Sequence, residues 1–396
     1  MPVSFPARPI AYPVVAIAFF VPQSFFLPIF PYAFLALGAV WIASVRRLTP
    51  LSIFAGLCVL TATVPPMLLS ERWASYIYLL SSLALVPLAA AVVRNLPREL
   101  MAAARLYLMV SLLAVSLGAV AFVAGAQTGI VFEDVSGVIR ARGLNEEPNF
   151  MGFSLVVIYI LVLFHDSRRA GTVIVAVIWC LALASFSVYA IGSLFVVSLI
   201  HILWKRKFVH MVWLFLPLIP VVLLNVDRIE AIVQGVDNSA NFRTWGAILV
   251  AYEVLLQECG LTGCGIGNLR SVLQGSPLME RFSGFDMLPN LAASALLEVG
   301  PVGVIVIFGL IFAAAFGNPL RRNGNHGLSV AAFYCLLSYA LSGSYLYDPH
   351  FWATLGLFAA VCRSWKIYPR SREARAVDAP GLGSVAFQQM NPSGYR

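Results

Sequence analysis

Apolar runs of about 20 residues recur along almost the whole chain, and they restrict the fold more than any other feature. Hydrophobic residues make up 60% of the 396 residues and charged residues only 11%, whereas a soluble domain carries roughly 25% charged residues. Only helices and closed barrels satisfy every backbone amide inside lipid, and runs of this length are typical of helices. The sequence therefore predicts an all-α, polytopic membrane protein.

About twelve apolar segments are predicted to span the membrane, which places both termini on the same side. They are residues 9–21, 28–45, 51–69, 74–93, 106–126, 150–166, 171–186, 187–204, 209–226, 290–316, 326–343 and 349–365. The predicted organisation is a single membrane domain over residues 1–365, with one large outer loop over residues 227–289. A polar tail over residues 366–396 is expected to be disordered and cytoplasmic.

The basic residues predict the orientation of these segments. With the N-terminus inside, nineteen of the 26 Lys and Arg residues fall on the inner side, as the positive-inside rule requires. The net charge of +8 is thereby explained by orientation, and it does not indicate a nucleic-acid partner. The chain has no G-x-x-x-x-G-K loop, no H-E-x-x-H motif and no close His/Cys cluster, so we expect neither ATP-driven transport nor a metal site.

The stretch from Arg140 to Gly152 gathers two arginines, two glutamates and two asparagines between two apolar segments. Pro148 and Gly143 are incompatible with a regular helix here. We therefore expect a structured loop that leads into a helix near Asn149.

The arginines on the outer side favour an anionic ligand, since a guanidinium binds phosphate oxygens through two parallel hydrogen bonds. Arg140, Arg142 and Arg243, together with a helix N-terminus, would form a cradle for a pyrophosphate. The alternative is that the arginines pair with carboxylates, because thirteen of the 18 acidic residues fall on the outer side. We favour the anion site for Arg140 and Arg243, and carboxylate pairing for Arg228 and Arg281.

The outer loop 227–289 contains a segment with helical spacing of apolar residues, Asn241–Glu258. We expect an amphipathic helix that lies over the membrane part, with an apolar face formed by Phe242, Trp245, Ile248, Leu249, Tyr252 and Leu256. The glycines at positions 260, 263, 265 and 267 predict a flexible turn after it. Cys259 and Cys264 would bridge on an oxidising side, but the short spacing favours two free thiols.

Three polar residues belong to the last segments. Glu298 is the one acidic residue placed within a predicted span, and an intramembrane carboxylate is a functional candidate, although fixing helix packing is an equal alternative. Asn290 is eight residues earlier, so both can face the same side of that helix. His350 follows Asp348 and is either a proton carrier or a local partner of that carboxylate.

Three motifs, in this order, resemble those of the bacterial O-antigen ligase and polysaccharide polymerase superfamily. They are Arg140-Ala-Arg-Gly143 followed by Pro148-Asn149, a long outer loop with an arginine and a tryptophan that closes on Gly263-Cys-Gly-Ile-Gly267, and the stretch that begins Pro289-Asn290-Leu-Ala-Ala-Ser. The resemblance covers residues 140–361.

The resemblance implies a helical membrane fold of the lipid-linked-sugar glycosyltransferase (GT-C-like) type, active at the periplasmic face of the bacterial inner membrane. It implies a metal-independent inverting enzyme without a cofactor, which polymerises undecaprenyl-diphosphate-linked repeat units. The implied partners are these glycans, membrane lipid, and a flippase and a chain-length regulator of the same pathway. An O-antigen ligase is the first alternative and a transporter is the second.

The resemblance also assigns roles to residues. Arg140 and Arg243 match family arginines that would neutralise the diphosphate leaving group. Family members usually have His-Asn where this chain has Pro289-Asn290, and because proline cannot accept a proton, the base must be another residue. Glu147, which shares the loop with Arg140, is our first choice. The other candidates for the base are Glu146, Asp286 and His350, and the residues expected to bind substrate are Arg142, Asn149, Asn290, Glu298 and His350.

Overall fold

The computed structural model describes the chain between residues 71 and 364 with gaps, together with a few single positions before residue 71. The described ranges are 71–95, 97–125, 131–135, 138–145, 147–165, 169–205, 246–274, 290–317, 326–342 and 346–364, with the single positions 16, 19, 20, 129, 226, 230, 242 and 288. One compact unit spans Met1–Ser364, and a second unit, Trp365–Arg396, lies outside the described residues.

The described part is mostly helical, and eight of its helices coincide with predicted apolar segments. They are α4 (Glu71–Asn95), α5 (Pro97–Val123), α6 (Pro148–His165), α7 (Arg169–Ser185), α8 (Val188–Lys205), α16 (Leu291–Phe316), α17 (His326–Ser342) and α18 (Pro349–Ser364). By length and composition, α5, α8 and α16 contain stretches able to cross a membrane. The predicted segments 9–21, 28–45, 51–69 and 209–226 lie outside the described residues, apart from four single positions.

The helix α5 begins nine residues before the predicted segment, at Pro97. Proline is favoured at the first helical position, and Glu99 in the first turn suits the positive end of the helix dipole. Large apolar side chains are exposed on α5, among them Met109 (69%) and Val120 (69%). An apolar surface of this kind is expected where a helix faces lipid.

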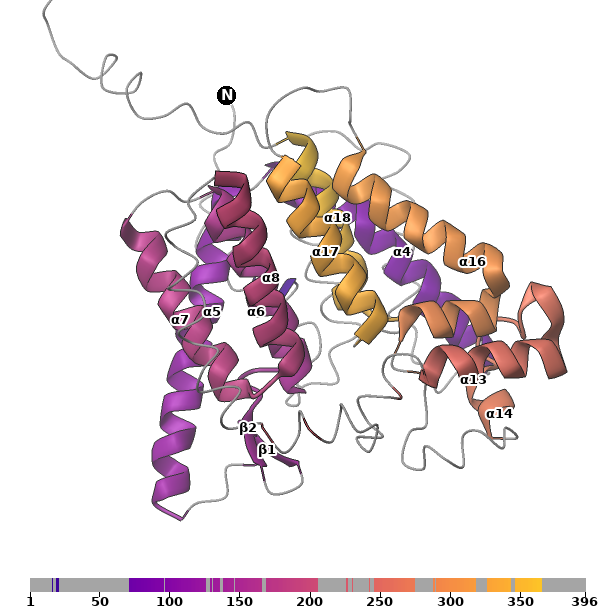
Figure 1. Cartoon of the computed structure of the whole chain (residues 1–396), viewed down its shortest axis with the longest axis horizontal. Coiled ribbons are helices and arrows are strands. Elements are labelled where there is room, and N and C mark those ends of the chain that lie inside the picture. Colours follow the sequence, from indigo (N-terminus) through magenta and orange to yellow (C-terminus); the bar gives the residue numbers. More distant parts are fainter. Residues whose placement is uncertain are drawn as a thin grey trace, which may run out of the picture. The chain divides into compact units, whose positions relative to one another are not determined.

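The helices pack as Figure 1 shows, with α18 alongside α4 and α6 alongside α7 and α8. The α17 helix contacts α6, α8, α16 and α18. The side chains of Leu155, Ile158 and Leu161 on α6 are fully buried, which fits a helix that is apolar on all sides. Gly356 brings α18 against the backbone of α4, because a Cβ there would overlap the Val86 carbonyl.

A β-hairpin precedes α6, and the all-α prediction missed it. The strands β1 (Phe132–Val135) and β2 (Val138–Ala141) pair antiparallel. The sequence signal was the pair Ser136-Gly137 between two short runs rich in β-branched and aromatic residues. The predicted start of the following helix is confirmed, since α6 begins at Pro148.

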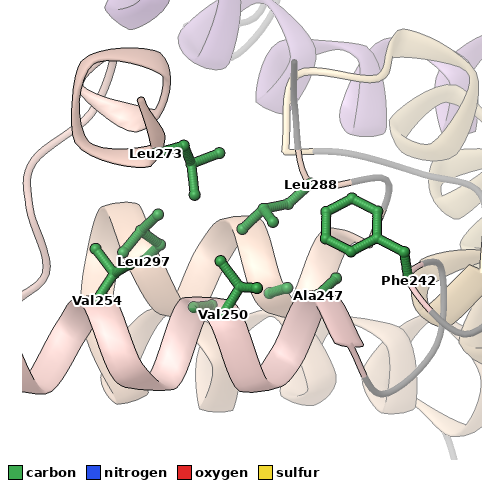
Figure 2. Packing of buried hydrophobic residues seen from close by; sticks show 9 residues of the cluster. Phe242, Ala247, Val250, Val254, Leu273, Leu288 and Leu297 are labelled. Carbon is green, nitrogen blue, oxygen red and sulfur yellow. The ribbon is translucent and has the colours of Figure 1, made fainter. Parts of the chain in front are cut away.

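The predicted outer-loop helix exists as α13 (Ala247–Val254). Of its predicted apolar face, Phe242 is buried and Trp245 lies outside the described residues, but the prediction is wrong for the other four residues. Ile248, Leu249, Tyr252 and Leu256 are 38–57% exposed. The side chains that α13 itself buries are alanines and valines, and they pack with Leu297 of α16 in a cluster that Figure 2 shows. The members of this cluster are Phe242, Ala247, Val250, Ala251, Val254, Leu273, Leu288, Ala293 and Leu297. The start of α16 is rich in alanine, and small facing side chains let two helices approach closely.

The α16 helix is interrupted at Gly300-Pro301. Gly300 has φ 79° and ψ −175°, which is not helical, and proline cannot donate the next backbone hydrogen bond. The 26 residues of α16 therefore form two helical segments, Leu291–Val299 and Pro301–Phe316, that meet at a kink. Glu298 lies at the end of the first segment.

The segment after α13 is closed by a disulfide, so the expectation of two free thiols is wrong. A π-helical turn, η4 (Leu255–Cys259), and a 3-10 turn, η5 (Gly260–Thr262), fold the chain back on itself. Positive φ angles at Gly260 and Gly263 permit this path. The Cα atoms of Cys259 and Cys264 are 4.7 Å apart and their sulfur atoms are bonded.

Candidate functional site

Arg140 lies at the end of β2 and is buried, with 8% of its surface exposed. Its Nε donates a hydrogen bond to the carbonyl oxygen of Ser185, 3.2 Å away, at the C-terminal end of α7. A cation there also suits the negative end of the helix dipole. Arg142 is equally buried and donates to the carbonyl oxygen of Gly129. The structure thus holds both guanidinium groups against backbone oxygens rather than in open solvent.

Asn149 contacts the same turn as Arg140. Ser187 Oγ, in the connection between α7 and α8, donates to Asn149 Oδ1 at 2.9 Å. Phe186 lies between the two serines with a positive φ of 45°, which is uncommon for a bulky residue. The turn Ser185–Ser187 therefore brings two predicted site residues, Arg140 and Asn149, to one place.

Asn145 belongs to this region, although no local pattern distinguishes it from its neighbours. It is 1% exposed, and its Nδ2 donates to the hydroxyl of Tyr107 on α5 at 2.7 Å. Its Oδ1 has no hydrogen-bond partner among the described residues. Gly143 lets the loop fold onto α6, since its φ is +60° and a Cβ would lie 2.8 Å from Met151 Sδ. The side-chain oxygen of Asn145 is thus available to accept a hydrogen bond from a polar ligand or water.

Glu147, the first choice for the base, is half-buried directly before α6, and its backbone carbonyl accepts from Met151 N at 3.3 Å. Glu146 and Arg243, with Asp286 and Pro289, lie outside the described residues.

His350 is buried in the second position of α18 and contacts α6. Its Nε2 is 3.2 Å from Ser154 Oγ, and its ring meets Phe153 edge-on at 4.8 Å. Its partnership with Asp348 runs through the backbone, because the His350 amide donates to Asp348 Oδ1 at 2.8 Å. Asp348 Oδ2 accepts from the Tyr339 hydroxyl at 2.8 Å, so this carboxylate caps α18 and ties it to α17. His350 Nδ1 has no hydrogen-bond partner among the described residues.

Asn290 is fully buried and caps α16. Its Oδ1 accepts from the Ala293 amide at 3.1 Å, and its Nδ2 donates to the carbonyl oxygen of Leu341 at 2.8 Å. The side chain therefore joins the start of α16 to the end of α17.

The substitution Asn290→Ala is expected to lower the free energy of unfolding by about 2–4 kcal/mol, because it removes a helix cap and leaves the Leu341 carbonyl without its donor. Thermal unfolding of the purified protein in detergent measures the loss. Asn290→Ser keeps a side-chain acceptor for the Ala293 amide and loses only the bond to Leu341, so it should lose less. Equal losses in the two variants would contradict this account of the cap.

Glu298 is 2% exposed and bonds to the connection between α17 and α18. The Tyr347 hydroxyl donates to Glu298 Oε2 and accepts from the Gly267 amide at 3.2 Å. Burial, and after it the nearby carboxylate, raises the pKa of Tyr347 above its ordinary value, so the hydroxyl stays protonated as a donor. Glu298 Oε1 has no hydrogen-bond partner among the described residues. The partners of this carboxylate are the Tyr347 hydroxyl and the Gly267 backbone amide, and the second of these is a backbone group, as the packing alternative named.

The predicted site residues thus form two groups. Arg140 and Asn149 meet at the turn Ser185–Ser187. Asn290 contacts Leu341 at the end of α17, and Glu298 contacts Tyr347 before α18. His350, three residues after Tyr347, contacts α6. In the parts of the chain that the structure describes, no three His, Cys, Asp or Glu side chains are placed to hold a metal ion. Neither the protein-family models nor the curated proteins compared with this chain match it.

Proposed function

We propose that this protein is a membrane glycosyltransferase that polymerises oligosaccharide repeat units carried on undecaprenyl diphosphate, at the periplasmic face of the bacterial inner membrane. The observation that carries the proposal is the buried guanidinium of Arg140 at the entrance to α6, in an apolar helical body. A guanidinium excluded from water binds phosphate oxygens more strongly than one in solution. The proposal further takes the fold as about twelve spans of the GT-C-like type.

In the proposed reaction, a hydroxyl of the acceptor sugar attacks the anomeric carbon of the donor sugar. The bond from that carbon to the diphosphate oxygen breaks, the diphosphate leaves with the electron pair, and Glu147 takes the hydroxyl proton. Arg140 and Arg243 stabilise the negative charge on the leaving group. Arg142, Asn149, Asn290, Glu298 and His350 bind the two substrates, and exposed apolar faces such as that of α5 receive the polyprenyl chain.

Deletion of the gene tests the proposal and separates it from the ligase alternative. We expect cells without the protein to accumulate single repeat units on the lipid carrier, because initiation and export do not depend on the polymerase. Mass spectrometry of the extracted lipid-linked glycans measures their length. Accumulation of whole polymers on the carrier would instead indicate a ligase, and unchanged glycans would contradict both.

A transporter is the second candidate, and the interruption of α16 favours it. Transporters bind ions and substrates where helices are broken, and Glu298 is buried beside such a break. Transporters of this kind are built from two structural repeats, and each repeat contributes one interrupted helix to the binding site. Proteoliposomes that accumulate a solute when they contain this protein, without forming polymer from lipid-linked units, would support the transporter over the glycosyltransferase.

A further inference from the structure

The loop of residues 259–267 binds the interrupted end of the first α16 segment. The Cys264 amide donates to the Leu297 carbonyl oxygen at 2.8 Å, and the Gly265 amide donates to the Glu298 carbonyl oxygen at 3.0 Å. The last carbonyls of a helix have no partner within it, and the break at Gly300-Pro301 creates such an end inside α16. The loop therefore supplies the hydrogen bonds that the break removes.

The contact between loop and helix is close at the backbone. A Cβ at Gly263 would lie 2.7 Å from both the Glu298 carbonyl oxygen and the Gly300 amide nitrogen. The disulfide between Cys259 and Cys264 joins the two sides of the loop directly around this contact. A crosslink reduces the number of conformations open to the loop, so the amides stay aligned with the helix end.

The same loop fixes the Glu298 side chain through a tyrosine. The Gly267 amide donates to the Tyr347 hydroxyl, which in turn donates to Glu298 Oε2. The Tyr347 backbone is held as well, since Ser82 Oγ on α4 donates to its carbonyl oxygen at 3.3 Å. One carboxylate oxygen is thus engaged, and the buried Oε1 remains without a hydrogen-bond partner among the described residues.

We propose that the disulfide-closed loop 259–267 and Tyr347 are a positioning device for Glu298, which leaves its Oε1 as the acceptor for a hydroxyl group of the sugar substrate. Loop and tyrosine do not themselves contact the reacting atoms. The loop fixes the backbone of Glu298 and the tyrosine fixes its side chain. The part concerning the sugar rests on the proposed function, whereas the part concerning position does not.

A double-mutant cycle tests the positioning. The variants are Tyr347→Phe, the pair Cys259→Ala with Cys264→Ala, and Glu298→Gln, alone and in combination. We expect Tyr347→Phe to lower the yield of long-chain glycan per inserted protein by about tenfold or more, the usual effect of losing a hydrogen bond to a charged group. The cysteine pair should lower the yield as well, because the loop amides lose their alignment with the helix end. Neither should lower the yield further in the Glu298→Gln background, because both act through that carboxylate.

Two matched controls separate positioning from general damage. Tyr252→Phe removes a hydroxyl from the exposed face of α13, and Cys180→Ala with Cys362→Ala removes two free thiols. Both controls should retain the wild-type yield. If the loss of glycan yield in a combined variant equals the sum of the separate losses, the proposal is overturned. Alkylation of Cys259 and Cys264 in protein that has not been reduced would also overturn it.

Hydrogen exchange of the loop distinguishes a failure of this inference from a failure of the proposed function. The amides of Cys264, Gly265 and Gly267 should exchange slowly in the wild type. Exchange at Gly267 should be faster in Tyr347→Phe, and exchange at Cys264 and Gly265 should be faster without the disulfide. If exchange is faster in these variants but deletion of the gene leaves the cell's glycans unchanged, the positioning is upheld and the glycosyltransferase is refuted. Unchanged exchange in both variants would refute the positioning whatever the glycan yield.

Discussion

Replacing Arg140 with alanine is expected to lower the yield of long-chain glycan by at least about 100-fold, the usual cost of removing one preorganised donor from a developing negative charge. The side chain is 8% exposed, so water replaces the lost guanidinium poorly. Gel analysis of glycan length, normalised to the amount of membrane-inserted protein, gives the measurement. Normalisation matters because the variant also loses the hydrogen bond to Ser185, which ties the hairpin to α7.

Two further variants show whether Arg140 binds substrate or a neighbouring carboxylate. Arg140→Lys keeps the charge but loses the planar pair of donors, so we expect a partial loss of yield. The backbone of Glu133 pairs with that of Arg140 in the hairpin register, which makes Glu133 the carboxylate to test for a pairing role. Glu133→Gln should leave the yield near the wild-type value. An equal loss in Glu133→Gln and Arg140→Ala would assign Arg140 to an ion pair, and polymer of full length from Arg140→Ala would remove it from the site altogether.

Gly263→Ala is expected to lower the free energy of unfolding by about 2–4 kcal/mol. Two effects add at this position. The φ of +81° is strained for any residue with a Cβ, and that Cβ would lie 2.7 Å from backbone atoms of Glu298 and Gly300, which cannot rotate away. Thermal unfolding in detergent, with thiol alkylation before and after heating, reports both the loss of stability and the fate of the disulfide.

Other glycines of the chain provide matched controls for this prediction. Gly260 has a φ of +66° but no atom within 4 Å of a Cβ, so Gly260→Ala carries only the backbone strain. Gly309 lies within α16 with open space around it, and Gly309→Ala should be neutral or slightly stabilising. The expected order of destabilisation is Gly263→Ala, then Gly260→Ala, then Gly309→Ala. Equal effects at Gly263 and Gly260 would mean that close contact between loop and broken helix contributes nothing.

The site could be predicted only as a set of residues, without their contacts. The sequence singled out Arg140, Asn149, Asn290 and Glu298, and the structure shows that each is held by a partner from another element. Ser187, Leu341 and Tyr347 are 38, 51 and 49 residues from the side chains that they hold. Such partners leave no local pattern in the sequence. Tyr347 and Asn145 were therefore missed, and Arg243 lies outside the described residues.

The sequence by itself determined the approximate positions of the eight apolar helices that the structure describes, because hydropathy is summed over each segment and does not depend on what the segment packs against. It also determined that α6 starts at Pro148, since proline restricts its own backbone. Tertiary structure alone decided which face of α13 is buried and that Cys259 and Cys264 are bonded. Small side chains of α13 let it approach the alanine-rich start of α16 closely, and an interrupted helix leaves carbonyls that a second segment must satisfy. Those requirements come from the shape and hydrogen-bonding groups of a neighbouring element, and no property of the loop sequence taken alone contains them.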